Sequence, residues 1–381
     1  MSTSTKGKVR LAVLGAGSFA EEAHIPDLKA HPQAEVVALY GRDLARTKAM
    51  ADRAGVPEAT DDLDALVARS DIDAVTIASS NDRHHPYTMA ALRAGKHVLC
   101  EKPMALTVAQ AAEMTREARA RAVVHQMAFT FRYTFCLEEL RRRLLAQEIG
   151  EPHFVEIHSE VFSRMAIEPG DATWRDDASL HGAGHLGEMG VHFADTINYL
   201  CGPTSGFISE VAAITHTLPR EVRGPGGRQE PVNTLDLASL LIRTERGLQG
   251  HILTSRVTPP PISYGTVHAG EPQRGHMGYI IVTGDRGALM STFTRGEVEA
   301  LHERRPGEPW QPVALPTEAG DGRPHGVSRM MHGFVDNVLR GGIDPERDAT
   351  FDDGYRSQAA IDAAMKAGRS RRWESVATTV D

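Results

Sequence analysis

The chain has 381 residues, of which 41% are hydrophobic and 24% charged, a globular composition with enough length for two domains. Its net charge is −8, from 42 basic and 50 acidic side chains, and the lack of a basic tract argues against nucleic-acid binding. The three irregularly spaced cysteines do not suit a disulfide framework, and neither a secretory leader nor an apolar run of about 20 residues is visible. We expect a soluble cytoplasmic protein with no membrane or nucleic-acid partner.

The N-terminal part alternates between strands and helices after a tail, residues 1–6, that is predicted to be disordered. Apolar runs predict strands at 9–14, 36–40, 74–78, 97–100 and 123–128, and helical periodicity predicts helices at 44–53, 87–94 and 108–121. This alternation is typical of βαβ units and predicts an α/β fold whose parallel sheet is covered on both faces. We expect it to form one domain over residues 7–130.

The rest of the chain, residues 131–381, follows a different rhythm and is expected to form a second, α+β domain. Its pattern predicts mainly antiparallel strands at 154–161, 211–216, 235–243, 249–255, 279–283 and 298–302, and helices at 137–147, within 182–200, at 329–339 and at 353–367. Proline and glycine are frequent in 218–232 and 257–277, which are predicted to be loops.

A glycine turn follows the first predicted strand in the stretch LAVLGAGSFAEEAH. Gly15, Gly17 and Ala20 match the pattern G-x-G-x-x-G/A. The first glycine permits a tight turn, the second lets the backbone approach a pyrophosphate, and the small third residue lets the helix pack on the strand. With Ser18 and Phe19 inside it, the turn predicts a doubly wound Rossmann domain that binds a dinucleotide; the alternative is a turn that only packs.

The end of the second predicted strand, VVALYGRDLAR, bears on the choice of dinucleotide. NAD sites usually place an acid there to bind the ribose 2′-hydroxyl, but Gly41 takes that position and Arg42 follows it. An arginine can bind a 2′-phosphate or stack on adenine, so we favour NADP over NAD. The alternatives are that Arg42 is a solvated surface charge and that Asp43, expected to cap the next helix, reaches the ribose.

Polar residues follow two other predicted strands of the parallel sheet. Ser79 and Asn81 come after one strand, and Glu101, Lys102 and Pro103 come after the next. Ligands of open parallel sheets bind outside the carboxyl ends of the strands, so these residues are expected to face the cofactor. A lysine there can donate to a substrate oxygen, although a merely polar strand end is the alternative.

Six stretches along the chain together resemble the Gfo/Idh/MocA family of oxidoreductases. They are GAGSFA, SSNDRHH, GKHVLCEKPMAL, FTFRYT, TWRDDASLHGAGHLGEMGVHFAD and FDDGYRSQAAIDAAMKAGRS. The resemblance implies a Rossmann domain followed by a domain with a large, mostly antiparallel open sheet. It also implies hydride transfer between NAD(P) and a carbon of a sugar, cyclitol or related polyol, and a homodimer or homotetramer assembled through that sheet.

The resemblance also assigns roles to single residues. Lys102 matches the lysine that binds the reacting hydroxyl near the nicotinamide, His192 matches the general acid/base, and Glu188 stands where the family usually has aspartate. Other matches border the cofactor or the substrate: Asn81 and His84 along the ribose, Trp174 and Arg175 beside the nicotinamide, and Arg132 after the sixth strand. His185 and His181 come from HGAGHLGE, which replaces the usual run of glycines.

The spacing of His181, His185, Glu188 and His192 would place all four on one face of a continuous helix. Imidazole and carboxylate groups are zinc ligands, so a metal site is one interpretation. Interspersed glycines argue against a continuous helix, which we expect to begin near Leu186, and our prediction includes no metal. The other interpretations are histidines that line a polar pocket and direct contact between His185 and the substrate.

The predicted mechanism places a substrate hydroxyl between Lys102 and His192. His192 takes the hydroxyl proton, Lys102 stabilises the developing alkoxide charge, and the carbon releases a hydride to the nicotinamide. Two rival functions stay open on the same fold. One is a glycosidase that uses a tightly held NAD, and the other is a ligand-sensing regulator without catalysis.

Overall fold

The computed structural model describes residues 7–160, 170–257, 276–294, 300–315 and 325–380. It divides the chain into two compact units. Unit 1 comprises residues 1–133, 325–355 and 380–381, and unit 2 comprises residues 134–324 and 356–379. The predicted disordered tail lies outside the described residues.

Unit 1 is built on a parallel sheet with the strand order β3-β2-β1-β4-β5-β6. Its strands are β1 (Val9–Leu14), β2 (Ala34–Tyr40), β3 (Glu58–Thr60), β4 (Ala74–Ile77), β5 (His97–Cys100) and β6 (His125–Met127). The order reverses between β1 and β4, which creates the switch point where ligands of such sheets bind. The predicted doubly wound Rossmann sheet is therefore confirmed.

The helices of unit 1 follow its strands along the chain. They are η1 (Ala20–His24), α1 (Ile25–Ala30), α2 (Leu44–Ala54), α3 (Leu63–Val67), α4 (Asn81–Arg93), α5 (Val108–Ala120), η2 (Thr130–Tyr133) and α9 (His325–Arg340). Asp43 caps α2, because its side chain accepts a hydrogen bond from the Arg46 N–H. This capping role agrees with the expectation from the sequence.

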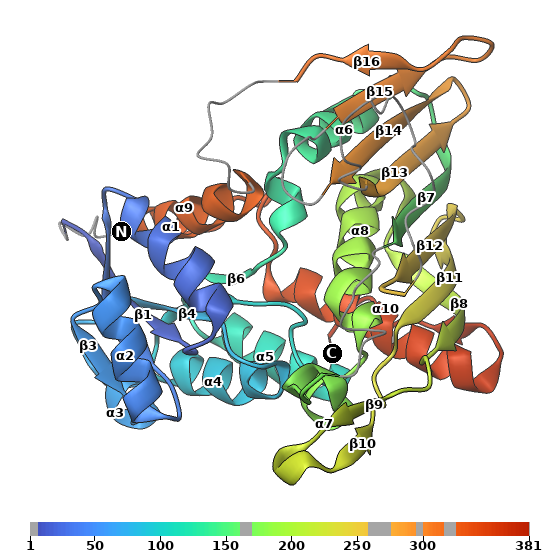
Figure 1. Cartoon of the computed structure of the whole chain (residues 1–381). Helices are drawn as coiled ribbons and strands as arrows, with labels where there is room; N and C mark the ends of the chain where they lie inside the picture. Colours follow the sequence, from blue (N-terminus) through green and yellow to red (C-terminus); the bar gives the residue numbers. More distant parts are fainter. Residues whose placement is uncertain (1–6, 161–169, 258–275, 295–299, 316–324, 381) are drawn as a thin grey trace, which may run out of the picture. The chain divides into compact units, whose positions relative to one another are not determined.

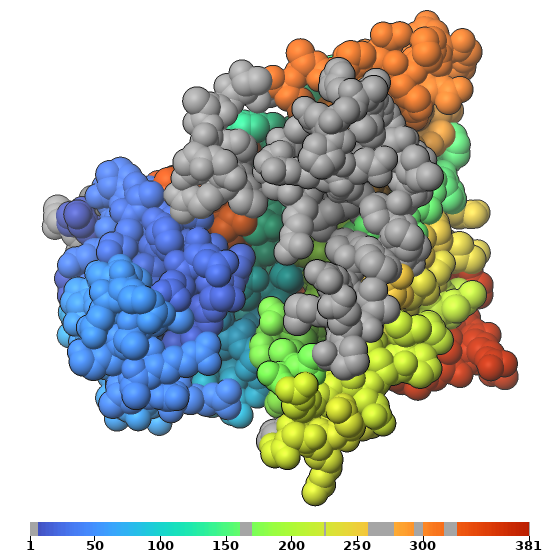
Figure 2. Space-filling model, in the orientation of Figure 1, coloured from blue at the N-terminus to red at the C-terminus, as the bar shows by residue number. Residues whose placement is uncertain are grey.

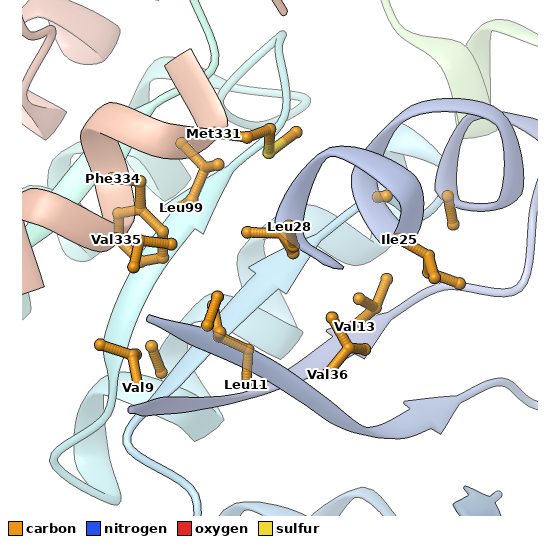
Figure 3. Close-up of a cluster of buried hydrophobic side chains, with 14 of the residues drawn as sticks. Val9, Leu11, Val13, Ile25, Leu28, Val36, Leu99, Met331, Phe334 and Val335 are labelled. Atoms are coloured by element: carbon orange, nitrogen blue, oxygen red, sulfur yellow. The ribbon is translucent and has the colours of Figure 1, made fainter. Parts of the chain in front are cut away.

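A cluster of buried apolar side chains joins α9 to the first strands of unit 1 (Figure 3). Met331, Phe334 and Val335 are fully buried, and they belong to the same cluster as Val9 and Leu11 of β1. The structure thus assigns α9 to unit 1, whereas the sequence pattern placed all residues after 130 in the C-terminal domain.

Unit 2 contains a sheet of nine strands with the order β16-β15-β14-β13-β7-β12-β11-β8-β17. The strands are β7 (Pro152–Glu160), β8 (Ile208–His216), β11 (Leu237–Thr244), β12 (Gln249–Ser255), β13 (His276–Gly284), β14 (Gly287–Thr294), β15 (Ala300–Arg304), β16 (Gln311–Val313) and β17 (Glu374–Ser375). β7 and β12 are parallel, and the other described pairs are antiparallel. The predicted large, mostly antiparallel sheet is confirmed.

One face of this sheet packs against helix α8 (Val191–Ser205), as Figure 1 shows. Val155 and Ile157 of β7 are fully buried, whereas Glu156 and His158, which alternate with them, lie on the opposite face. The other helices of unit 2 are α6 (Phe135–Leu145), η4 (Trp174–Asp176), α7 (Ala178–His181), η5 (Leu186–Gly190) and η6 (Pro225–Gly227). Helix α10 (Phe351–Ser370) begins in unit 1 and continues into unit 2.

The structure corrects several details of the sequence prediction. Strands β3, β14, β16 and β17 were not predicted. Residues 218–232, predicted to be a loop, contain β9 (Glu221–Arg223) and β10 (Gln229–Pro231), which pair as a small separate sheet that projects from the surface of unit 2 (Figure 2). Most of the other predicted loop, 258–275, lies outside the described residues.

The three cysteines are buried thiols. Cys100, Cys136 and Cys201 form no disulfide, and burial raises the pKa of the Cys100 and Cys201 thiols to about 12.

Among the described residues, no helix combines the length and the apolar character that crossing a bilayer requires.

Candidate functional site

The glycine turn after β1 lies at the switch point of the unit 1 sheet. Gly15 has a φ of +130°, and a Cβ added to it would lie 2.5 Å from the carbonyl oxygen of Ala78, which follows β4. Since β1 and β4 are neighbours, only glycine lets the two strand ends approach this closely. The structure therefore explains the first glycine of the motif by packing within the protein.

Gly17 differs from Gly15, because the protein itself leaves room for a side chain there. A Cβ at Gly17 would lie 3.9 Å from the nearest heavy atom, the Ala78 carbonyl oxygen. The missing side chain thus leaves space open beside the turn, which fits the close approach of a pyrophosphate. Ala20 is fully buried where the motif requires a small residue, and Phe19 is 43% exposed in the turn beside Ser18.

The end of β2 has no space for the acid that NAD sites usually carry. A Cβ at Gly41 would lie 2.3 Å from the Thr47 hydroxyl oxygen and 2.9 Å from the Cβ of Ala16 in the glycine turn. Arg42 follows at an exposed position, free of this crowding. The structure therefore leaves Arg42 as the charged side chain at this strand end, since the Asp43 carboxylate caps α2.

A buried histidine connects the helix after the glycine turn to the loop after β5. His24 of η1 is fully buried; its Nε2 lies 3.3 Å from Glu101 Oε1, and its Nδ1 lies 3.1 Å from the Thr76 hydroxyl of β4. His24 was not among the predicted site residues. It lies four residues after Ala20, the last residue of the motif, but its partner is 77 residues away, so no local pattern reveals the pair.

Glu101 is ionised at neutral pH although it is buried. Burial alone would raise its pKa, but the hydrogen bond with His24 and the nearby positive charge of Lys102 hold the pKa below its ordinary value. Lys102, half-buried, follows it, and the Lys102 N–H donates to Glu101 Oε2 over 3.2 Å. The carboxylate thus fixes the backbone at the residue predicted to bind the substrate hydroxyl.

His84 lies beneath two of the loops at the carboxyl edge of the sheet. Its Nδ1 is 2.7 Å from the Pro103 carbonyl oxygen, and its Nε2 is 3.3 Å from the Ser79 carbonyl oxygen. Burial lowers the pKa of this imidazole, so at neutral pH it carries one N–H. We assign this N–H to Nδ1, which makes the shorter contact and donates to the Pro103 carbonyl. The observed contacts make His84 a residue that supports both loops. Asn81, the first residue of α4, is also buried.

In unit 2, the predicted residues gather around the Glu188 carboxylate. Its Oε1 lies 3.2 Å from Arg175 Nε and 3.2 Å from His181 Nε2. The Arg175 guanidinium stacks over the Trp174 ring at 4.4 Å, and the Trp174 and His181 rings are 5.1 Å apart. Glu188 remains 27% exposed, so the cluster presents a carboxylate that is already oriented by cationic and imidazole partners.

The glycines of HGAGHLGE shape the loop that brings these histidines to Glu188. Gly184 has a φ of +59°, and a Cβ there would lie 2.4 Å from backbone atoms of Leu235. The next residue, His185, donates its backbone N–H to the Leu235 carbonyl over 2.8 Å, and its Nδ1 lies 3.5 Å from Glu188 Oε2. His181 ends α7, which agrees with the expectation that both histidines precede the helix that starts at Leu186.

The remaining predicted residues lie at different places in the two units. His192 is buried, on the first turn of α8, in the same unit as Glu188. Arg132 is buried in unit 1, where its Nη2 lies 3.4 Å from the Asp353 carboxylate at the start of α10. This ion pair gives Arg132 a structural role in unit 1, and contact between Arg132 and a substrate stays a prediction.

His181 is a second residue that the predicted site did not include. The sequence spacing drew attention to it, but the glycines argued that the chain does not continue as one helix from His181. That argument is correct, yet the positive φ of Gly182 and Gly184 turns the loop so that His181 still contacts Glu188. The spacing rule applies to regular helices, so it cannot predict that a turning loop brings His181 to Glu188.

Two protein-family models match the chain, one for each part. The model described as the oxidoreductase family with an NAD-binding Rossmann fold matches residues 9–129. The model described as the GFO/IDH/MocA C-terminal domain matches residues 137–289. Together these matches extend over more than half of the chain and agree with the two folds of the structure.

Several characterised and uncharacterised proteins are similar along the sequence. An uncharacterized oxidoreductase of Synechocystis sp. is 28% identical, covering 96% of this chain and 95% of that protein. Levoglucosan dehydrogenase of Pseudarthrobacter phenanthrenivorans is 26% identical, covering 91% of this chain and 90% of its own. D-glucoside 3-dehydrogenase of Escherichia coli is 31% identical over 53% of this chain and 56% of its own.

Solved structures share the fold over nearly the whole chain. A levoglucosan dehydrogenase in complex with NADH and L-sorbose superposes with a TM-score of 0.84 at 22% identity, covering 97% of this chain and 99% of that one. An oxidoreductase domain protein from Kribbella flavida gives 0.83 at 24% identity, with 97% and 100% coverage. From its family matches and its fold, the chain belongs to the Gfo/Idh/MocA family of NAD-binding oxidoreductases.

Proposed function

We propose that this protein transfers a hydride between a nicotinamide dinucleotide and a carbinol or carbonyl carbon of a sugar or glycoside. The observation that carries the proposal is the joint match of both family models to a chain whose glycine turn leaves space for a pyrophosphate. The names of several relatives support the sugar class, among them D-glucoside 3-dehydrogenase and glucose-6-phosphate 3-dehydrogenase. These names make the pyranose ring, and its carbon 3, the first candidate for the reacting position.

For the cofactor, we favour NADP over NAD. Arg42 is exposed at the end of β2, where a guanidinium can form a charge-assisted bond to a 2′-phosphate. The crowding around Gly41 supports this choice, because it leaves no room there for a carboxylate that would bind the 2′-hydroxyl of NAD. Ser79, Asn81 and Glu101 lie at the ends of the neighbouring strands and complete the proposed cofactor side.

In the oxidation direction, Lys102 Nζ donates a hydrogen bond to the substrate hydroxyl oxygen, and His192 takes the hydroxyl proton. As the O–H bond breaks, its electron pair forms the carbonyl, and the hydride leaves the carbon. The nicotinamide, when bound, accepts that hydride. The positive charge of Lys102 stabilises the negative charge that develops on the oxygen. Reduction reverses each of these transfers.

Glu188 is proposed to position the substrate and His192, with Arg175 and His181 holding its carboxylate. The two hydrogen bonds to Glu188 Oε1 support this role, because they restrict the side chain before a substrate arrives. Trp174 is proposed to border the nicotinamide, as the resemblance to the family implies. The stacked Arg175 guanidinium supports this role only in that it holds the Trp174 ring in place. His185, close to Glu188 Oε2, is proposed to contact a further hydroxyl of the sugar.

The test is a screen of levoglucosan, alkyl glucosides, 1,5-anhydro sugars and free aldoses with NAD and with NADP. Formation of reduced nicotinamide, followed by absorbance, is the expected result for at least one sugar. The variant Lys102→Ala should then lose most activity and still bind the cofactor. Hydrolysis of a glycoside without net reduction would instead show the NAD-dependent glycosidase, and saturable sugar binding without turnover would show a sensor.

We also propose that the chain forms a cytoplasmic homodimer or homotetramer through the face of the nine-stranded sheet opposite α8. Ile214 of β8 and Leu241 of β11 are 73% and 53% exposed, and Phe154 of β7 is 37% exposed. Exposed apolar side chains on one sheet face are typical of a protein interface. Light scattering after gel filtration tests this, because a monomer at micromolar concentration would contradict it.

A further inference from the structure

Two histidines and a glutamate meet on the face of the unit 2 sheet opposite α8. Glu156 and His158 are two residues apart on β7, so both side chains point to the same face. His251 is on the neighbouring strand β12, where its register partner is Glu156. All three are only partly buried, with side-chain exposures of 30% for Glu156 and 19% for His158.

The three ligand atoms lie close enough to share one ion. His158 Nε2 is 2.9 Å from Glu156 Oε1 and 3.2 Å from His251 Nδ1, and one ligand atom from each residue falls within 4.8 Å of the others. Zinc bonds of about 2.0–2.1 Å in a tetrahedron separate neighbouring ligand atoms by about 3.3 Å. Two of the edges therefore already approach the spacing that zinc requires.

Hydrogen bonds alone satisfy this arrangement poorly. The single N–H that His158 Nε2 can carry points at either Glu156 or His251, so one of these contacts is left without a donor from that nitrogen. A cation between the three atoms would accept lone pairs from all of them at once. The geometry thus distinguishes this cluster from an ordinary pair of hydrogen-bonded histidines.

Neighbouring side chains hold the ligands in place as the outer contacts of metal sites do. The Ser239 hydroxyl lies 2.9 Å from His251 Nε2, which directs the lone pair of Nδ1 toward the cluster when Nε2 carries the proton. Tyr279 donates its hydroxyl to Glu156 Oε1 over 2.9 Å, and its ring stacks on His158 at 4.8 Å. Each of the three ligands is thus fixed by a partner on an adjacent strand.

We propose that Glu156, His158 and His251 bind one Zn²⁺ ion per chain, with water in the fourth position. Two imidazoles and one carboxylate form a ligand set that zinc accepts, and imidazole favours zinc over magnesium or calcium. The ion joins β7 to β12, the parallel pair in the described part of the sheet, which are distant along the chain because β7 ends at Glu160 and β12 begins at Gln249. Its role is to stabilise the sheet.

The test is a zinc titration of the untagged, full-length protein after chelator treatment, against a chromophoric competitor. The expected result is one zinc per chain, a higher melting temperature with zinc, and the visible absorption of four-coordinate Co²⁺ when cobalt replaces it. The variants His158→Gln and His251→Gln should lose stoichiometric binding. His153→Gln is the matched control, because His153 is exposed on the same strand outside the cluster and should bind as the wild type does.

A milder variant separates weaker zinc binding from loss of the fold. Ser239→Ala removes only the partner of His251 and should weaken zinc binding by roughly 10–100-fold with an unchanged circular dichroism spectrum. The proposal is overturned if the wild type binds no stoichiometric zinc, or if His158→Gln and His251→Gln bind as the wild type does. Loss of the ion in the double variant His181→Gln/His185→Gln alone would also overturn it, because the zinc would then belong to the Glu188 cluster.

Discussion

At the scale of single residues, the choice between two cofactors depends on one strand end. Gly41 is enclosed by Thr47 and by Ala16 of the glycine turn, so its replacement would disturb the turn itself. Arg42 is exposed and can change without such a cost. The two neighbouring positions therefore offer a clean separation between packing and cofactor recognition.

Arg42→Ala is expected to weaken NADP binding much more than NAD binding. Only NADP offers a phosphate for a charge-assisted bond of about 1.5–3 kcal/mol, which corresponds to roughly 10–150-fold in the dissociation constant. Calorimetric titration with both cofactors measures the two changes. If both cofactors weaken equally, Arg42 acts by stacking or by structure, and the preference for NADP is not due to it.

Glu188 and His192 are expected to act as one unit in catalysis. His192→Ala should lower kcat/KM by about 10²–10⁴-fold, as the loss of a general acid/base does. Glu188→Gln keeps the size of the side chain but removes the charge that pairs with Arg175, so it should cost less. Once His192 is replaced, adding Glu188→Gln should cost little more. Fully multiplicative losses in the double variant would show that Glu188 acts on the substrate independently of His192.

His84 predicts a pH dependence of stability. Burial lowers its pKa in the folded state, so below the unfolded value of about 6.5 the unfolded chain binds a proton that the folded chain does not. The free energy of unfolding is therefore unaffected by this group above that pH. It decreases as the pH falls below it, by up to about 1.4 kcal/mol per pH unit. Urea unfolding from pH 7 to 5 should show a shallower decline for His84→Gln than for the wild type. Identical slopes would mean that His84 titrates alike in both states.

At the scale of elements, a buried polar network ties the end of β6 to α9. The Tyr133 hydroxyl donates to Asp348 Oδ1 and accepts from Gln126 Nε2, each over 2.7 Å. Asn337 of α9 donates to both Gln126 and Asp348. These side chains come from segments more than 200 residues apart, and each has its partners within unit 1.

Tyr133→Phe should destabilise unit 1 although it removes a single oxygen. It leaves the Asp348 carboxylate and the Gln126 amide without their shared partner in a fully buried setting, which costs about 1–3 kcal/mol. Urea unfolding followed by circular dichroism measures the loss, and the unfolding slope should stay the same. A loss below about 0.5 kcal/mol would show that water or neighbouring donors replace the hydroxyl.

Two short π-helices show what the sequence could and could not predict about the site. Both η1 and η5 span five residues, close with an i→i+5 hydrogen bond, and run into an α-helix. Each carries a residue of a candidate site, His24 in η1 and Glu188 in η5. The sequence predicted helix starts at these places, but periodicity assumes 3.6 residues per turn, so it could not predict which side chains a wider turn brings together.

Two of the missed strands, β3 and β16, are too short to show a periodic pattern. β3 has only three residues, Glu58–Thr60, none of them buried, and β16, Gln311–Val313, is equally short and contains a proline. Neither offers an apolar alternation to detect. Most of the longer inner strands of both sheets were predicted, because burial selects the apolar residues that make the pattern visible. The inner strand β14 was missed, since two of its buried residues, Ser291 and Thr292, are polar.

At the scale of the whole molecule, the sequence predicted both folds but not the membership of α9. Its pattern is that of an ordinary amphipathic helix, and periodicity does not tell which sheet an apolar face covers. The structure places Met331, Phe334 and Val335 in one core with Val9 and Leu11. Unit 1 is therefore made of segments from both ends of the chain, and the residues of unit 2 lie between these segments along the sequence.

A fragment comprising residues 7–133 is expected to fail to fold by itself, because the face that α9 covers would be exposed. The same fragment with residues 325–355 appended through a flexible linker should melt cooperatively, as followed by circular dichroism and calorimetry. Phe334→Asp in the appended helix is the matched control and should abolish the rescue, since Phe334 is fully buried. Cooperative melting of residues 7–133 alone would show that α9 is dispensable for the core.

The divided unit 1 has a consequence for the order of events during synthesis. A ribosome working at about 5–20 residues per second needs roughly 10–40 s to proceed from residue 133 to residue 325. During that interval the nascent Rossmann sheet lacks its α9 cover, and apolar surface of β1 and α1 faces the solvent. We expect the growing chain to depend on chaperones in this window, and the nucleotide site to mature only after almost the entire polypeptide has left the ribosome.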